Sequence, residues 1–229
     1  MSNLIARIAK ASVLVGALTL AACADVQQAL GPDGEPTARA STKTPELDYA
    51  MRWDHQPNSD AWTATAVSAL RTHGAVLPHM VPRDIEKWCP GYVNGSQEER
   101  EAFWVGLISA LAKHESTWNP KAVGGGGAWF GLVQISPQTA RGYNCAARSG
   151  EALKNGASNV SCAIRIMSRT VARDGVVSEG MRGVAADWGP FHSAKKRSDM
   201  IEWTRSQPFC QGKTEAKGPA ALLKGLTKG

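Results

Sequence analysis

The sequence predicts one mainly α-helical domain with an extension at each end. Several segments place apolar residues at the three- and four-residue spacing of a helix face, whereas alternating runs of strand length are almost absent. The chain has 229 residues, 43% of them hydrophobic, which suits one core of ordinary size. No internal repeat is visible, so we expect a single helical unit.

The first 22 residues have the composition of an export signal. Arg7 and Lys10 precede the apolar run "ASVLVGALTLAA", which is too short to span a bilayer comfortably. The run ends on "LAAC", which resembles the lipobox of bacterial lipoproteins and implies that Cys23 is lipidated after cleavage. With Ala24 rather than Asp after the cysteine, the lipoprotein sorting rules imply an outer-membrane anchor facing the periplasm. A soluble secreted protein is the alternative.

Residues 23–46 are rich in Pro, Gly, Ser, Thr and charge, which is typical of a flexible tether, and the tail 213–229 is similarly loose. This leaves residues 47–212 for the helical domain. Without residues 1–22 the chain keeps 24 of its 26 basic residues against 20 acidic ones. This mild positive charge suits an anionic partner, but no basic cluster is dense enough to predict nucleic-acid binding.

Five helices are predicted within the domain. The clearest is the second, because Ser96 and Glu99 form a capping box in front of a long apolar segment. The first helix is expected to start at Asn58 or Ser59, the second at Ser96, and the third at Ser136 with Pro137 in its first turn. The fourth is expected over 158–171, and the fifth, expected to be the last, over 192–206.

Four cysteines remain after Cys23, and an even number in an exported chain predicts two disulfides. Three pairings are possible. We favour Cys145 with Cys162, which brackets a loop, and Cys89 with Cys210, which joins early and late segments. Neither the cysteines nor the histidines have the spacing of metal ligands, and no metal or organic cofactor is expected.

Glu115 is the candidate catalytic residue. In the predicted second helix it shares a stripe with Trp104, Ile108 and Leu111, at steps of four, three and four residues. It also lies in the last turn, where the helix dipole opposes a carboxylate. Both desolvation and the dipole raise a carboxyl pKa, as a general acid at neutral pH requires. Helical phase alone does not exclude an ordinary solvated glutamate.

The residues that follow Glu115 occur in a recognisable order. The stretch "ESTWNPKAVGGGGAWFGLVQISPQTA" resembles the lysozyme-like domain of the soluble lytic transglycosylases, whose pattern runs from Glu-Ser through Asn-Pro to Gly-Leu-Met-Gln-Ile and Pro-x-Thr-Ala. Val133 replaces the usual Met. The resemblance covers roughly residues 97–192 and implies a goose-type or SLT lysozyme-like fold. The matching residues are Glu115, Ser116, Asn119, Pro120, Ala122, Gly131, Leu132, Gln134, Ile135, Pro137, Thr139 and Ala140.

The resemblance also implies a reaction. Glu115 would cleave the β-1,4 bond between N-acetylmuramic acid and N-acetylglucosamine in peptidoglycan glycan strands and leave a 1,6-anhydro end. Glycoside hydrolases generally use two carboxylates, and the absence of Asp and Glu from 116 through 150 is consistent with a single acid. Glu151, Asp174 and Asp187 remain acids that folding could bring into the groove.

Seven residues are expected to bind substrate. Gln134 is expected to hydrogen-bond acetamido or hydroxyl groups, and Trp129 and Trp188 to stack on sugar rings. The glycine run 124–127 is expected to form a mobile lip over the cleft. The seven are Ser116, Trp129, Gly131, Leu132, Gln134, Asp187 and Trp188.

The chain departs from the family pattern in places that concern substrate contacts. Gly124 stands where the family often has Ser, and Ala186 with Asp187 stands where it has Tyr-Asn. Trp188 and Tyr143 are candidates to replace the missing Tyr. Two alternatives therefore stay open: a lysozyme-like hydrolase of peptidoglycan or a chitin-like glycan, and an inactive glycan-binding lipoprotein.

Overall fold

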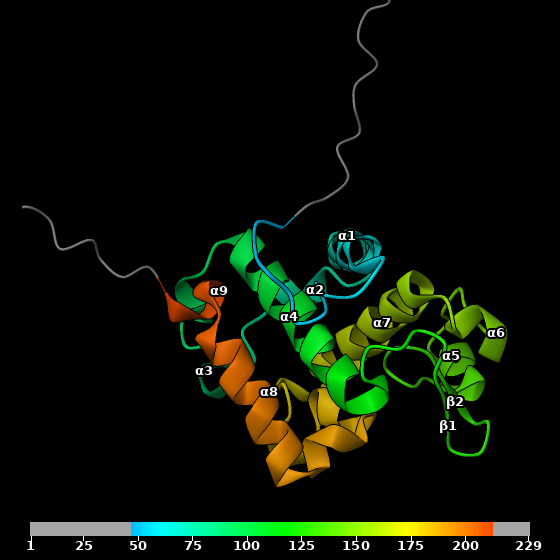
Figure 1. The fold of residues 1–229 in the computed structure, drawn as a ribbon. Coiled ribbons are helices and arrows are strands. Elements are labelled where there is room, and N and C mark those ends of the chain that lie inside the picture. The colour runs from blue at the N-terminus through cyan, green and yellow to red at the C-terminus, as the bar shows by residue number, and fades with distance from the viewer. Residues whose placement is uncertain (1–46, 213–229) are drawn as a thin grey trace, which may run out of the picture. The chain divides into compact units, whose positions relative to one another are not determined.

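Helices dominate the computed structural model, which describes residues 47–212 (Figure 1). The longer helices are α1 (Ser59–Leu70), α4 (Gln97–Ser116), α7 (Gly156–Asp174) and α8 (Ala194–Ser206). The shorter ones are α2 (Val76–His79), α3 (Ile85–Trp88), α5 (Pro137–Gly142), α6 (Gly150–Leu153) and α9 (Pro208–Gln211). Four 3-10 turns complete the helical elements: η1 (Tyr92–Asn94), η2 (Glu179–Met181), η3 (Gly183–Ala186) and η4 (Gly189–His192). The predicted mainly α fold is confirmed.

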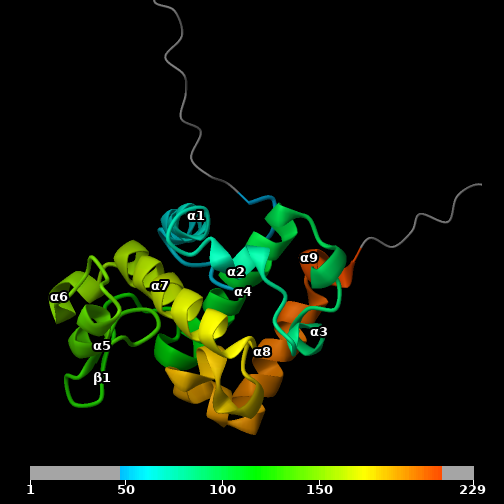
Figure 2. The same cartoon turned by 180° about the vertical axis from the view of Figure 1, so that it is seen from behind.

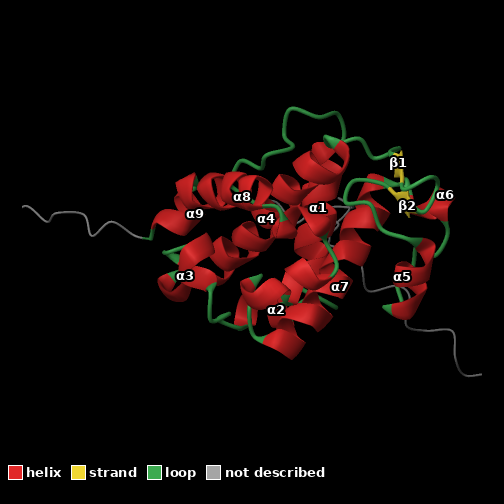
Figure 3. Ribbon diagram, turned by 90° about the horizontal axis from the view of Figure 1, so that it is seen from below, coloured by secondary structure: helices red, strands yellow, loops and turns green. Residues whose placement is uncertain are grey.

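Strand structure in the described residues is limited to one antiparallel hairpin. Its strands β1 (Val123–Gly124) and β2 (Trp129–Phe130) pair Val123 with Phe130 and Gly124 with Trp129. The hairpin lies with α5 and α6 at the end of the domain opposite α3 and α9 (Figures 1 and 3). Two-residue strands are too short for alternation to reveal them in a sequence.

Helix α4 is the central element of the core. It packs against α1, α2, α8 and α9, and every residue from Glu101 to Ala112 is buried (Figures 1 and 2). Its start is the predicted capping box: the Ser96 hydroxyl accepts from the Glu99 N–H at 3.2 Å, and the Glu99 carboxylate accepts from the Ser96 N–H. The expected single apolar stripe needs correction, because all faces of α4 are buried between Glu101 and Ala112.

The other predicted helices form with shifted boundaries. α1 begins at Ser59, and Asn58 precedes it in a left-handed conformation without a side-chain cap. Ser136 caps α5 as expected. α7 begins two residues earlier than predicted because the Asn155 side chain accepts from the Ser158 N–H. The segment at 192–206 is not the last helix, since α9 follows it.

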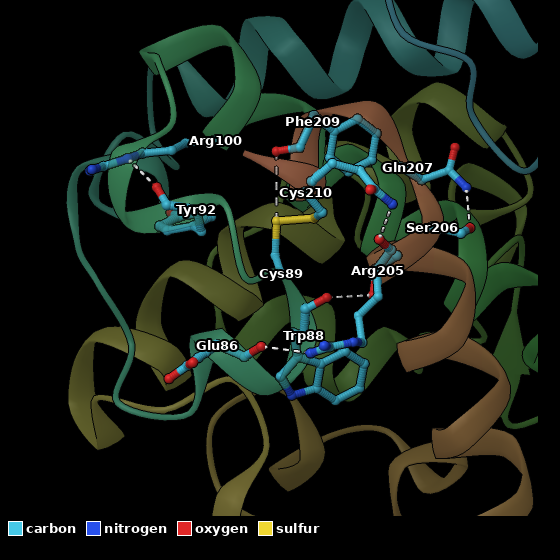
Figure 4. The surroundings of a disulfide bond; sticks show 12 residues. Glu86, Trp88, Cys89, Tyr92, Arg100, Arg205, Ser206, Gln207, Phe209 and Cys210 are labelled. Carbon is cyan, nitrogen blue, oxygen red and sulfur yellow. Dashed lines mark hydrogen bonds between the residues drawn. A yellow bond between two sulfur atoms is a disulfide. The ribbon is translucent and has the colours of Figure 1, made fainter. Parts of the chain in front are cut away.

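Both favoured disulfides form, Cys89 with Cys210 and Cys145 with Cys162. The first spans 121 residues and joins the end of α3 to α9 (Figure 4). Beside it, the Arg205 guanidinium of α8 donates to the carbonyl oxygens of Glu86 and Lys87. Early and late parts of the domain are therefore joined covalently and by hydrogen bonds.

No helix within residues 47–212 is long and apolar enough to cross a bilayer. The predicted signal peptide 1–22, the lipidation at Cys23, the tether up to residue 46 and the tail 213–229 lie outside the described residues.

Candidate active site

A cavity of about 460 Å³ opens beside the last turn of α4. Its walls come from α4, the β1–β2 hairpin, the segment around η4, and α8, which supplies Lys196. Five residues singled out in the sequence line it: Glu115, Trp129, Gln134, Asp187 and Trp188. Folding therefore brings together side chains that lie up to 73 positions apart in the sequence.

Glu115 is a partly buried carboxyl on the wall of this cavity. Burial raises its pKa from 4.5 to about 7, and the nearby Lys196 ammonium opposes this rise. The carboxyl has no hydrogen-bond partner among the described residues, so its oxygens are free to bond to a ligand in the cavity. A group that holds its proton near neutrality and releases it at little cost can serve both as acid and as base.

Ser116 and Leu132 position the site from outside the cavity. The Ser116 hydroxyl donates to the carbonyl oxygen of Leu132 at 2.8 Å and so joins α4 to the loop 131–134. The Leu132 side chain is fully buried, and Gly131 is buried as well. Neither these two nor Ser116 line the cavity, so in this structure they support the loop, and their contact with substrate stays a prediction.

Asn159 of α7 holds the same loop and was given no role from the sequence. Its buried amide accepts from the Val133 N–H at 3.0 Å and donates to the carbonyl oxygens of Phe130 and Leu153 at 2.9 and 3.0 Å. Gly131 has a φ of +82°, and a Cβ there would lie 2.4 Å from the Asn159 amide nitrogen. The loop therefore requires a glycine at 131 and an amide at 159.

Gln134 and Trp188 line the cavity, and both side chains already donate hydrogen bonds to backbone carbonyl oxygens of the protein. The Gln134 amide nitrogen donates to the carbonyl oxygens of Gly131 and Ala122 at 2.9 and 3.3 Å, which leaves its oxygen for a ligand. The Trp188 indole N–H donates to the Val133 carbonyl oxygen at 2.8 Å. Because Trp188 is only 3% exposed, it forms part of the wall, and its expected stacking role is not supported.

Trp129 is the exposed aromatic of the hairpin, with half of its surface accessible. Its ring lies against Gly125, where a Cβ would come within 2.2 Å of it. Gly126 and Gly127, at the tip, have positive φ angles and open space around them. The hairpin thus presents an indole at the cavity, on a backbone whose positive φ angles favour glycine.

Asp187 is a second carboxyl on the same cavity. It accepts a hydrogen bond from the Tyr143 hydroxyl at 3.2 Å, and desolvation raises its pKa. Glu151 and Asp174 do not line the cavity and pair with Lys154 and Arg173 instead. The absence of acids from 116–150 therefore does not leave Glu115 as the cavity's single acid.

A cluster centred on Asp199 joins α8 to the last turn of α4. Its carboxylate accepts from Arg52 at 2.6 Å, Lys113 at 2.9 Å and His114 at 2.7 Å. Hydrogen bonding to Arg52, followed by that to Lys113 and His114, holds the Asp199 pKa well below its usual range. Because the same helix carries Lys196, the cluster also places the ammonium near Glu115. Nothing in the local sequence around these residues signals the contact.

Comparison with known proteins agrees with this geometry. Residues 93–181 match the family model described as Transglycosylase SLT domain. Residues 93–181 are thus similar to the SLT domain family.

Solved structures support the same assignment. Two Glu-to-Gln mutants of DslA (Bd0314) have TM-scores of 0.66 and 0.65 and 26% sequence identity, each covering 72% of this chain and 100% of theirs. A wild-type form of DslA has a TM-score of 0.61 at 24% identity. No curated protein sequence matches the chain. The predicted lysozyme-like fold is confirmed.

The SLT match covers only part of the cavity. Glu115, Trp129 and Gln134 lie within the matched residues, whereas Asp187 and Lys196 lie beyond them. The described residues contain no group of three side chains placed to hold a metal ion. The wall formed by η4 and α8 thus lies beyond the residues that the family model matches.

Proposed function

We propose that this SLT domain is a peptidoglycan lytic transglycosylase that cleaves the β-1,4 bond between N-acetylmuramic acid and N-acetylglucosamine. The observation that carries the proposal is Glu115, a carboxyl with a pKa of about 7 on the wall of a cavity in an SLT domain. At neutral pH a large share of such carboxyls holds a proton to donate. An exposed glutamate would be almost fully ionised.

In the proposed reaction Glu115 donates its proton to the glycosidic oxygen as the bond to C1 of the muramoyl residue breaks. The resulting carboxylate then takes the proton from the 6-hydroxyl of the same residue while that oxygen bonds to C1. The products are a 1,6-anhydro-muramoyl end and a free 4-hydroxyl on N-acetylglucosamine, and Glu115 regains its proton. Lys196 favours the ionised form of Glu115 between the two steps.

The proposed substrate contacts follow from what remains unpaired in the cavity. Trp129 offers an exposed ring face at the hairpin, on which a sugar can stack. Gln134 offers its amide oxygen to an acetamido N–H or a hydroxyl. Gly124 allows this amide to lie close to β1, because a Cβ there would come within 2.2 Å of the Gln134 oxygen.

A lysozyme-like hydrolase is the second candidate, and Asp187 is the observation that favours it. Hydrolysis needs a carboxylate that activates water or attacks C1, and Asp187 lines the same cavity as Glu115. Its hydrogen bond from Tyr143 fixes the carboxylate without neutralising it. In the transglycosylase, Asp187 binds the sugar and takes no proton.

Product analysis separates these candidates. The soluble chain from residue 24 onward, which lacks the lipidated cysteine, is incubated with purified sacculi, and the released ends are identified by mass spectrometry. We expect anhydro ends from the wild type and a loss of at least 100-fold in Glu115→Gln. Glu151→Gln is the matched control, since Glu151 is exposed and lies outside the cavity.

Each other outcome has a definite meaning. Reducing ends that disappear in Asp187→Asn would establish the hydrolase. Undiminished anhydro ends from Glu115→Gln would refute the catalytic assignment. Binding to sacculi without any release would leave the glycan-binding protein as the function.

We also propose that lipidated Cys23 anchors the protein to the outer membrane, with the SLT domain facing the periplasm. The support is the "LAAC" sequence, followed by Ala24. Incorporation of labelled palmitate and co-fractionation with outer membranes are expected for the full chain and lost in Cys23→Ser. A Cys23→Ser chain that still fractionates with that membrane would refute the anchor.

A further inference from the structure

A second cavity, of about 430 Å³, lies against α7 and shares no lining residue with the cavity at Glu115. Ser158, Ser161 and Arg165 line it from one face of α7, at steps of three and four residues. Thr65 of α1 and His73, which follows α1, form the facing wall.

Most polar side chains on this cavity make no hydrogen bond to other residues that the structure describes. The Arg165 guanidinium and the hydroxyls of Thr65, Ser158 and Ser161 have no hydrogen-bond partner among the described residues, and no acidic residue lines the cavity. His73 is fixed by a 3.1 Å hydrogen bond from its Nε2 to the Ser161 carbonyl oxygen. Hydroxyls without a partner around an unpaired guanidinium can bind a ligand that carries anionic oxygens. The planar guanidinium matches the geometry of a carboxylate best.

The rest of the lining is small and apolar. It consists of the Cys145–Cys162 disulfide with Ala146 and Ala157. A ligand that fills the cavity therefore carries a short aliphatic group beside its anionic end. A methyl group meets this description, whereas a long or charged side chain would find no partner there.

We propose that this cavity binds the carboxylate end of a short peptide that terminates in alanine. Arg165 pairs with the carboxylate, the hydroxyls of Ser158 and Ser161 bond to its oxygens or to the peptide amide, and the alanine methyl contacts the apolar lining at Ala146 and Ala157. The source of such a peptide, the stem peptides of peptidoglycan, rests on the proposed function. The cavity then holds a strand by its peptide while the Glu115 cavity cleaves the glycan.

Calorimetric titration tests the site without relying on catalysis. The soluble chain from residue 24 onward, carrying Glu115→Gln, is titrated with N-acetyl-Ala-Ala, with the same peptide as its C-terminal amide, and with inorganic phosphate. We expect the free acid to bind at least tenfold more tightly than the amide or phosphate. Arg165→Gln should weaken its binding at least tenfold. Arg169→Gln, one turn further along α7 and outside the cavity, should change it less than twofold.

Three results would overturn the proposal. These are no binding of the free acid, equal binding by Arg165→Gln, and equal affinity for phosphate, which would show a general anion site. An active chain with Arg165→Gln should lose its preference for stem-bearing over stem-free glycan but still cut both. If the wild type cut neither substrate, the proposed function would fail, and the titration would still decide the peptide site.

Discussion

Replacing Glu115 by glutamine should stabilise the folded domain at alkaline pH while abolishing activity. Folding raises the Glu115 pKa from 4.5 to about 7, so between these values the folded carboxyl binds more protons than the unfolded one. The free energy of unfolding therefore falls as pH rises through this window, and the loss is complete above about 7. Glutamine has nearly the same shape and carries no charge, so it avoids the loss.

The magnitude follows from the size of the rise. At about 1.4 kcal/mol for each pKa unit, the change corresponds to roughly 3 kcal/mol, and water in the open cavity screens part of it. We expect Glu115→Gln to be about 1–3 kcal/mol more stable than the wild type at pH 8.5. At pH 4, where both folded and unfolded carboxyls are largely protonated, the difference should be close to zero.

Unfolding in guanidinium chloride, followed by tryptophan fluorescence with both disulfides intact, measures this difference. Glu151→Gln is the control, because Glu151 is exposed and Lys154 lowers its pKa. Equal stability of wild type and Glu115→Gln at pH 8.5, or a gain of the same size at pH 4, would refute the reasoning. The wild-type cleavage rate should decline above pH 7 for the same reason, as the acid loses its proton.

The remaining predictions concern the supports of the site, each measured by the same unfolding assay at pH 7. Asn159→Ala should cost about 3 kcal/mol, since three backbone groups lose their partner. Gly131→Ala should cost roughly 2 kcal/mol or more, because the site combines a positive φ with a close contact. Asp199→Asn should cost about 1–3 kcal/mol, and the difference should shrink as pH falls below 3.8, because the unfolded wild-type chain then binds a proton at Asp199 while the paired carboxylate of the folded state resists protonation. Replacing Cys145 and Cys162 by alanine should cost about 3 kcal/mol.

Each of these four has a result that would contradict it. Neutral surface substitutions change the free energy of unfolding by up to roughly 0.5 kcal/mol. A change no larger than this for Asn159→Ala or Gly131→Ala would mean that the loop 131–134 does not depend on these residues. For Asp199→Asn, a deficit that stays constant down to pH 2 would exclude its ion pairs as the cause. For the cysteine pair, unchanged stability would mean that the disulfide restrains no unfolded conformations.

Local signals predicted two helix starts from their side-chain caps. The Ser96 capping box and the Ser136 cap formed as expected, because each needs only residues three positions apart. The short helices α2, α3, α6 and α9 were missed. A single turn has too few residues for a detectable period, and packing rather than sequence stabilises it.

For the site, the sequence located Glu115 but for an incomplete reason. The apolar stripe does not distinguish one face of α4, since the core surrounds the helix, and what exposes Glu115 is the emergence of its last turn at the cavity. Asp187 and Lys196 reach the cavity through the packing of η4 and α8, which no local spacing records. The Asp199 cluster was invisible for the same reason, because its partners lie 85 or more positions away.

The Cys89–Cys210 bridge has a consequence for survival among proteases. All the residues that line the Glu115 cavity lie between these two cysteines in the sequence, inside one covalent ring. A protease that nicked the exposed glycine tip of the hairpin at 125–127 would open the backbone at one point, and the two pieces would stay linked through sulfur. Such a nicked molecule would run as one band on a non-reducing gel and as two after reduction.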